Sequence, residues 1–273
     1  MKSHACSSGL GVVTVARGVA LASSLAEMAV LVSRLARRAG SLRVVELHMT
    51  TDIVTCPPPC ATLVNPTNNE LCGTSLAYFP IGGPVPPRPP PGLTSTMWGG
   101  MDAGEGLLYR EQVVDGHVTE HGGRELAAAC RALPAVPGTD VRCPTGSAVV
   151  TRALGSLCHN FEHVVHTVPP FFSDEHWRAL LSGCYHACFE RAFRLSGAVA
   201  CPLLGAGARG APVGEAADVA AQATASWCAA DDIALVPEAA RRLKFALIDA
   251  AAHHAIERAL VGHGFAEVQL EVQ

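Results

Sequence analysis

Long uninterrupted runs of apolar residues are missing from this sequence, although 49% of its 273 residues are hydrophobic. A helix that crosses a membrane needs about 20 such residues in a row, so we expect no membrane span. Aromatic residues make up only 5% of the chain and charged residues 16%, which predicts a core built mainly from Ala, Val and Leu. The length suffices for one large domain or two small ones.

A basic surface is missing as well. The formal net charge is −4 at pH 7 and the pI is about 6.3. Because no positive field is present to hold phosphates, duplex nucleic acid is not expected as a partner. An anionic ligand would have to be bound locally, by backbone N–H groups or by the N-terminus of a helix.

The paired cysteines of disulfide-rich domains and zinc knuckles are also absent. The 11 cysteines are odd in number, which argues against a disulfide framework, and the prolines of CPPPC at residues 56–60 indicate a loop. Zinc needs four converging ligands, and a group of His and Cys at residues 158–188 could supply them. Their positions on a buried strand and an apolar helix face favour structural roles, so no metal site is expected for Cys158, His159, His163, His166, Cys184, His186 and Cys188.

The first forty residues permit two interpretations. They are rich in Ser, Ala and Arg, and Glu27 is their only acidic residue, as in a mitochondrial transit peptide. The interpretation that we favour is a strand at residues 12–15 followed by an amphipathic helix at about residues 21–38. Residues 1–41 are therefore an N-terminal extension, and we expect a cytoplasmic protein, or a mitochondrial one if the extension is a transit peptide.

Beyond residue 41, short apolar runs alternate with longer helical patterns. Strands are predicted at residues 42–49, 60–68, 163–170, 198–205 and 244–250, and helices at residues 118–133, 174–197, 212–230 and 251–264. Uniformly apolar strands that alternate with helices predict a mostly parallel sheet covered on both faces. Residues 74–112 are dense in Pro and Gly and predict a long insertion within a domain that spans residues 42–273.

Polar loops follow three of these strands, where ligands bind in sheets of this kind. Their sequences are TTDIVT at residues 50–55, VNPTNNELCG at residues 64–73 and GAGARGAP at residues 205–212. The spaced glycines of the last loop let main-chain N–H groups approach a ligand, and a helix is predicted directly after them. A simple strand-to-helix turn would have the same composition, so the glycines alone leave both interpretations open.

Six segments together resemble the macro domain, an ADP-ribose-binding family. Three of the segments contain the polar loops: TTDIVT, similar to the family's GDIT; LVNPTNNELCG, similar to VNAANxxLxGG; and CPLLGAGARGAP, similar to fPaiStGiyGyP. The other three are VVDGHVTEHGGRELAAACRAL at residues 113–133, CPTGSAVVT at residues 143–151 and FEHVVHTVPP at residues 161–170. Their order over about residues 42–262 carries the resemblance, which implies a three-layer α/β/α fold with a mixed, mostly parallel sheet.

The resemblance implies ligand contacts for individual residues. Asp52, beside Ile53, is expected to accept a hydrogen bond from the adenine amino group. Asn68 and, with less support, Asn65 are expected at the distal ribose. The remaining expected contacts, mostly with the diphosphate, are Val114, Gly205, Ala206, Gly207, Ala208, Arg209 and Gly210. A helix N-cap for Asp52 and turn positions for the asparagines are the alternatives.

Asp115, with Asn68, is the residue expected to carry chemistry. The resemblance implies that it activates a water by general-base action towards the anomeric carbon or an acyl ester of the distal ribose. The alternative is that the Asp-Gly pair forms a turn. The implied partner is ADP-ribose or an ADP-ribosylated protein, and no cofactor is expected. Two functions stay open: hydrolysis of mono-ADP-ribosyl or O-acyl-ADP-ribose linkages, and a non-catalytic reader of ADP-ribose or a related nucleotide.

Departures from the family pattern bear on hydrolysis more than on binding. The insertion at residues 74–112 would emerge beside the distal ribose and brings Asp102 and Glu105 close to it. Arg209 stands where hydrolytic members place an aromatic residue, although it could pair with a phosphate. Thr119 stands where the family often has His.

Overall fold

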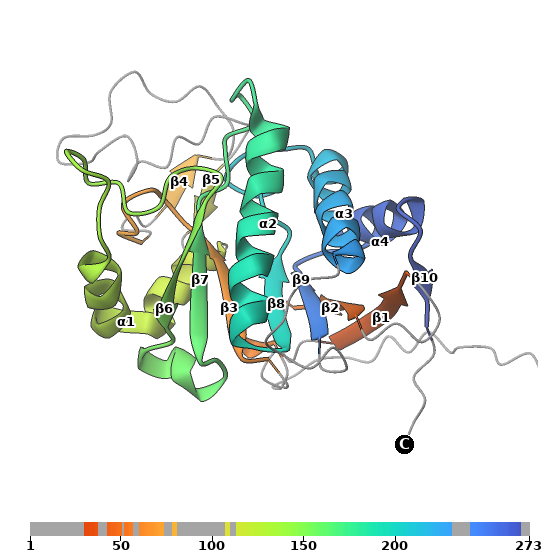
Figure 1. Cartoon of the computed structure of the whole chain (residues 1–273), viewed down its shortest axis with the longest axis horizontal. Coiled ribbons are helices and arrows are strands. Elements are labelled where there is room, and N and C mark those ends of the chain that lie inside the picture. The colour runs from red at the N-terminus through yellow and green to blue at the C-terminus, as the bar shows by residue number, and fades with distance from the viewer. Residues whose placement is uncertain are drawn as a thin grey trace, which may run out of the picture.

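An eight-stranded mixed sheet forms the centre of the computed structural model (Figure 1), in the strand order β10-β1-β2-β9-β8-β3-β7-β6. The structure describes residues 30–37, 43–50, 52–56, 60–73, 78–80, 107–109, 113–230 and 241–268. Five neighbouring strands run parallel: β2 (Arg43–Met49), β9 (Arg241–Leu247), β8 (Ala198–Pro202), β3 (Thr62–Pro66) and β7 (His163–Thr167). Antiparallel strands extend both sides: β1 (Val30–Ala36), β10 (Ala266–Glu267) and β6 (Ala148–Arg152).

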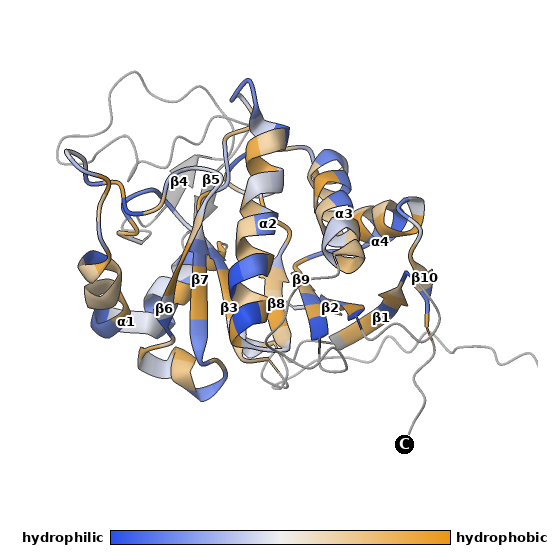
Figure 2. Ribbon diagram, viewed as in Figure 1, coloured by the Kyte–Doolittle hydropathy of each residue, from blue (hydrophilic) through white to orange (hydrophobic). Residues whose placement is uncertain are grey.

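Helices cover both faces of this sheet, which confirms the predicted three-layer α/β/α architecture. One face packs against α2 (Trp177–Leu195), α3 (Val213–Ala229) and α4 (Ala250–Gly262). The other face packs against α1 (Val114–Ala132) and two short 3-10 helices, η1 (Ile53–Thr55) and η3 (Gly155–His159). Figure 2 shows hydrophobic colour along the central strands and both colours on the helices, as expected for strands buried on two faces and helices buried on one.

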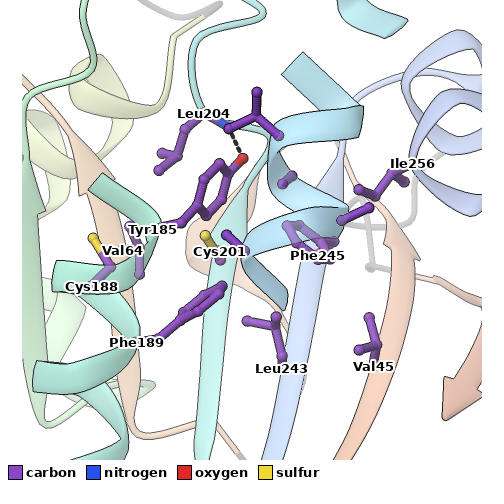
Figure 3. Packing of buried hydrophobic residues seen from close by; sticks show 14 of the residues in the cluster. Val45, Val64, Tyr185, Cys188, Phe189, Cys201, Leu204, Leu243, Phe245 and Ile256 are labelled. Atoms are coloured by element: carbon purple, nitrogen blue, oxygen red, sulfur yellow. Dashed lines mark hydrogen bonds between the residues drawn. The ribbon is translucent and has the colours of Figure 1, made fainter. Parts of the chain in front are cut away.

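The larger core also positions the glycine-rich loop that follows β8. Tyr185 of α2 is fully buried, and its hydroxyl accepts a hydrogen bond of 2.8 Å from the backbone N–H of Leu204 (Figure 3). Burial raises the pKa of this phenol, so the hydroxyl stays neutral. The bond fixes the first residues of the loop to α2.

The predicted strands and helices are present between residues 42 and 264, with shifted ends. The helix predicted at residues 118–133 begins earlier, at Val114, and the strand predicted at residues 244–250 begins at Arg241. The strands β6 and β10 were not predicted. Of the insertion at residues 74–112, the structure describes a two-stranded sheet of β4 (Tyr78–Pro80) and β5 (Leu107–Tyr109), and the rest lies outside the described residues.

The helix predicted at about residues 21–38 is wrong over its last part. Val30–Ala36 is the strand β1, which pairs with β2, so the sheet begins ahead of residue 42. Pairing with β2 places Arg34 opposite Glu46, and the two side chains form an ion pair. This tertiary contact outweighs the helical spacing of the apolar residues. The strand predicted at residues 12–15 lies outside the described residues.

A break inside α1 is made possible by two glycines. Gly123 has φ 58° and ψ −154°, a conformation that divides the helix into two segments. Gly155 of η3, with φ +60°, lies so close to the break that a Cβ atom there would be 2.3 Å from the carbonyl oxygen of His121. Only a residue without a side chain allows this approach, which holds the first segment of α1 in place.

We expect Gly155→Ala to lower the free energy of unfolding by about 2 kcal/mol or more, because it adds a backbone clash to an unfavourable φ. Gly262→Ala in α4 is the matched control, since a Cβ atom there meets nothing within 4 Å. Urea unfolding of both variants checks this. Equal stability of Gly155→Ala and the wild type would contradict the close approach.

Candidate functional site

The carboxyl ends of β2, β3 and β8 lie at one edge of the sheet, because these strands belong to the same parallel set. The three polar loops that follow them meet there with the first turn of α1. Residues that the sequence analysis proposed for a site therefore lie near one another although they are far apart in the chain, as expected for a sheet of this type.

Asp115 lies in the first turn of α1, not in an Asp-Gly turn. Its side chain is 9% exposed, and its Oδ1 accepts a hydrogen bond of 2.9 Å from Nδ2 of Asn65. A carboxylate is favoured at this end of a helix by the helix dipole. Val114, the first residue of the helix, packs against the smaller hydrophobic core.

Asn65 lies on β3 directly beside His166 on β7, and both side chains are almost fully buried. Its Nδ2 is 3.3 Å from Nδ1 of His166, while Nε2 of His166 is 2.9 Å from Oγ1 of Thr151 and 3.7 Å from Sγ of Cys130. Burial lowers the pKa of His166 to about 4, so its ring is neutral at pH 7.

A small cavity separates Asp115 from the second segment of α1. Its volume is about 30 Å³, room for one or two water molecules. Three polar residues, Asp115, Asn65 and His166, line it together with the apolar residues Val118 and Leu126. Thr119, Cys72 and Gly73 also line it.

Asp52 is the N-cap of η1 and also faces the candidate site. Its carboxylate accepts a hydrogen bond of 2.9 Å from the N–H of Val54, which caps η1 as the alternative interpretation predicted. The same carboxylate remains partly exposed, and Nδ1 of His117 and Nε2 of His121 lie 3.5 Å and 3.9 Å from its oxygens. Ile53 next to it is buried in the smaller core.

Asn68 shapes the loop after β3. Its Nδ2 donates to the carbonyl of Gly73 at 3.2 Å, and its Oδ1 accepts from the N–H of Cys72 at 3.1 Å. The side chain therefore holds the loop in a turn. A ligand that contacts Asn68 would have to do so in addition to these two hydrogen bonds.

The glycine-rich loop turns back on itself before α3. Gly205 and Gly210 have φ of +83° and +76°, and the N–H of Ala211 donates to the carbonyl of Gly205 at 3.0 Å. Within the described part of the chain, no backbone acceptor is paired with the N–H groups of Ala206, Gly207 and Ala208. Such a set of N–H groups is suited to bind an anion.

Arg209 is held in place at the end of this loop. Its Nη2 donates to the carbonyl of Thr67 at 2.9 Å, and its guanidinium lies 4.2 Å from the ring centre of Phe171. The backbone carbonyl of Arg209 accepts from the N–H of Phe172 at 2.9 Å. Phe171, in the loop after β7, therefore places an aromatic ring next to the arginine that stands where hydrolytic members have an aromatic residue.

The other His and Cys residues considered for metal binding occupy separate places. Cys184 and Cys188 are buried in the larger core, and His186 is on the outer side of α2, where Nδ1 lies 2.8 Å from the carbonyl of Ser182. In the regions that the structure describes, no group of three or more His, Cys, Asp or Glu could hold a metal ion. No described helix is long and apolar enough to span a bilayer.

Comparison with known proteins agrees with this geometry. A family model for the macro domain matches residues 102–220. A macro domain-containing protein of Streptomyces griseus is 34% identical over 149 residues, which cover 54% of this chain and 77% of that protein. The chain belongs to the macro domain family. Non-structural polyprotein p200 of Rubella virus is 33% identical over 179 residues, 61% of this chain but only 8% of the polyprotein.

Solved macrodomains share the fold at low identity. The Oceanobacillus iheyensis macrodomain with ADP has a TM-score of 0.55 and 20% identity, covering 81% of this chain and 91% of that one. The Trypanosoma brucei macrodomain in complex with ADP has a TM-score of 0.53 and 18% identity, covering 80% and 69%.

Several residues at the site of this macro domain were not singled out from the sequence. His117 and His121 lie one helical turn apart, a spacing that could have placed them on one face of α1. Phe171 directly follows a pair of prolines that end the strand pattern, and no sequence signal connects it with Arg209. Cys72 was quoted only within a loop, yet its exposed thiol lines the cavity.

We expect ADP-ribose to protect Cys72 from alkylation. Among the described cysteines, only Cys72 and Cys158 are exposed, and Cys158 lies on η3 away from the cavity lining. Desolvation by the surrounding protein raises the pKa of Cys72, so iodoacetamide labelling is run at mildly alkaline pH, where enough thiolate forms. Mass spectrometry reports both sites. Slower labelling at Cys158 as well as Cys72 would mean a general effect and not occupation of the site.

Proposed function

We propose that this macro domain binds ADP-ribose and hydrolyses mono-ADP-ribosyl or O-acyl-ADP-ribose linkages through Asp115. The binding part is supported by related structures: the Oceanobacillus iheyensis macrodomain with ADP, and a variant of it with ADPR. Asp52 would accept the adenine amino group, and the N–H groups of Ala206, Gly207 and Ala208 would bind the diphosphate.

The observation that carries the catalytic part is the placement of Asp115. Its carboxylate is held by Asn65 at the wall of a cavity with room for water, at the same sheet edge as the glycine-rich loop. A carboxylate positioned in this way can accept a proton from a water molecule. The water oxygen would form a bond to the anomeric carbon while the bond from that carbon to the acceptor breaks, or would attack the carbonyl carbon of an acyl ester. The acceptor or alcohol leaves with a proton.

A non-catalytic reader is the second candidate, and Asn68 favours it. Both polar atoms of its amide already bind the loop that follows β3, so this side chain is less free to orient a substrate. Binding of ADP-ribose does not require the hydrogen bonds of Asn68 to break. Positioning a water molecule for hydrolysis requires a free hydrogen-bonding group near the ribose.

Calorimetric titration tests binding. We expect ADP-ribose to bind more tightly than ADP or AMP, because only ADP-ribose reaches the pocket of Asp115. Asp52→Ala should weaken the affinity for all three nucleotides by about tenfold, which corresponds to the loss of one hydrogen bond to a charged group. Asp218→Ala, a change of the same type on the exposed face of α3, is the control. No heat with any of the three nucleotides would reject the proposed ligand.

Turnover separates the two candidate functions. Asp115→Asn keeps the size of the side chain and removes the base, so we expect kcat on mono-ADP-ribosylated protein or O-acetyl-ADP-ribose to fall by about 100-fold or more. Its affinity for ADP-ribose should stay within a few-fold of the wild type. Equal turnover of both proteins would reject the role of Asp115, and tight binding without turnover in the wild type would establish the reader.

A further inference from the structure

Both ring nitrogens of His166 are engaged, although this residue lies behind the proposed catalytic carboxylate and not at it. Nδ1 faces Nδ2 of Asn65 at 3.3 Å, and Nε2 faces Oγ1 of Thr151 at 2.9 Å. Asn65 then reaches Asp115 at 2.9 Å. A continuous buried chain of hydrogen bonds therefore joins β6, β7 and β3 to the first turn of α1.

The chain has a defined direction. An amide nitrogen only donates, so Nδ1 of His166 must be unprotonated where it meets Asn65. Because the pKa of His166 is lowered to about 4 by burial, the neutral ring carries its single proton on Nε2. That proton is donated to Thr151, whose hydroxyl oxygen accepts it.

This tautomer and the observed orientation of the Asn65 amide support each other. Its two N–H bonds point to two acceptors, Asp115 and His166, while its Oδ1 is buried and has no hydrogen-bond partner in the described structure. Turning the amide over would place Oδ1 against both acceptors. A ring protonated on Nδ1 would remove one of the two acceptors and draw Oδ1 towards itself, away from the observed orientation.

We propose that His166 is a positioning residue that keeps the amide of Asn65 donating to Asp115, and so aims the carboxylate at the cavity. The inference rests on the proposed function for its catalytic consequence, but the geometry that it claims can be tested without turnover. His166 is 2% exposed, and its bond to Asn65 lets it act on Asp115 through that residue, so we assign it no direct part in the chemistry.

Variants of the ring separate positioning from packing. His166→Phe keeps a flat ring and removes the acceptor, whereas His166→Asn keeps an acceptor near the place of Nδ1. Thr151→Val retains the shape of Thr151 and removes only the hydroxyl group that accepts the Nε2 proton. This variant replaces His166→Phe in the experiment if His166→Phe does not fold. His163→Phe on the same strand is the control, because Nδ1 of His163 is buried without a hydrogen-bond partner in the described structure.

Nitrogen-15 NMR of the wild type and the variants tests the positioning without any measurement of enzyme activity. We expect His166 to show the tautomer protonated on Nε2 at pH 7, and the side-chain amide of Asn65 to shift in His166→Phe and in Asp115→Asn but not in His163→Phe. A ring protonated on Nδ1, or an Asn65 amide that does not respond to His166→Phe, would overturn the inference.

Kinetics is the second arm. His166→Phe should lower kcat about tenfold with KM within twofold, and the acid limb of the kcat profile should move to higher pH, because a carboxylate that loses a donor binds its proton more tightly. His166→Asn should recover most of kcat. An equal loss of kcat in His166→Phe and His166→Asn, with an unchanged pH profile, would indicate that His166 acts through packing alone and would overturn the inference. Absence of turnover in the wild type counts against the proposed function, and the NMR arm then decides the positioning.

Discussion

The hydrogen bond from Asn65 to Asp115 is the contact on which the site depends, since it joins the sheet to the helix that carries the carboxylate. Asn65 can make it because β3 and β7 run parallel and in register, with His166 as the direct neighbour of Asn65. Buried amide and imidazole groups are costly unless they are paired. The bonds among Asn65, His166 and Asp115 offset part of this cost on the α1 side of the sheet.

The position of α1 depends in turn on close backbone contact. Gly155 lies against the carbonyl of His121, and Gly123 adopts a φ that breaks the helix. The first segment of α1 carries Asp115 on its inner side and His117 and His121 towards Asp52. Two proposed subsites, for the adenine and for the distal ribose, are therefore placed by one short helical segment, so a change at the break would alter both together.

The sequence predicts the architecture well because apolar strands alternate with helices over most of the chain. It predicts the start of α1 poorly, since Gly116, Gly122 and Gly123 lower the helical propensity of that segment and the contact with η3 compensates. It predicts β1 wrongly, because residues 30–36 fit an apolar helical pattern and only pairing with β2 shows otherwise. Asp52, Asp115 and the glycine-rich loop can be proposed as site residues from the sequence, whereas Phe171 and the hydrogen bonds through His166 depend on contacts between distant segments.

The contacts of Arg209 bear on the proposed diphosphate site. The guanidinium lies on the ring of Phe171, and one of its N–H groups binds a neutral carbonyl, that of Thr67. A charge-assisted hydrogen bond to a phosphate is roughly twice as strong as one to a neutral acceptor. Arg209 would therefore gain by exchanging the carbonyl for a phosphate oxygen, and contact with Phe171 limits the loss of side-chain freedom in either state. An arginine held beside the glycine-rich loop in this way would add positive charge to the proposed diphosphate site of a chain whose net charge is −4. In the proposed function, Arg209 would contribute to binding of the diphosphate, whereas the chemistry would rest on Asp115.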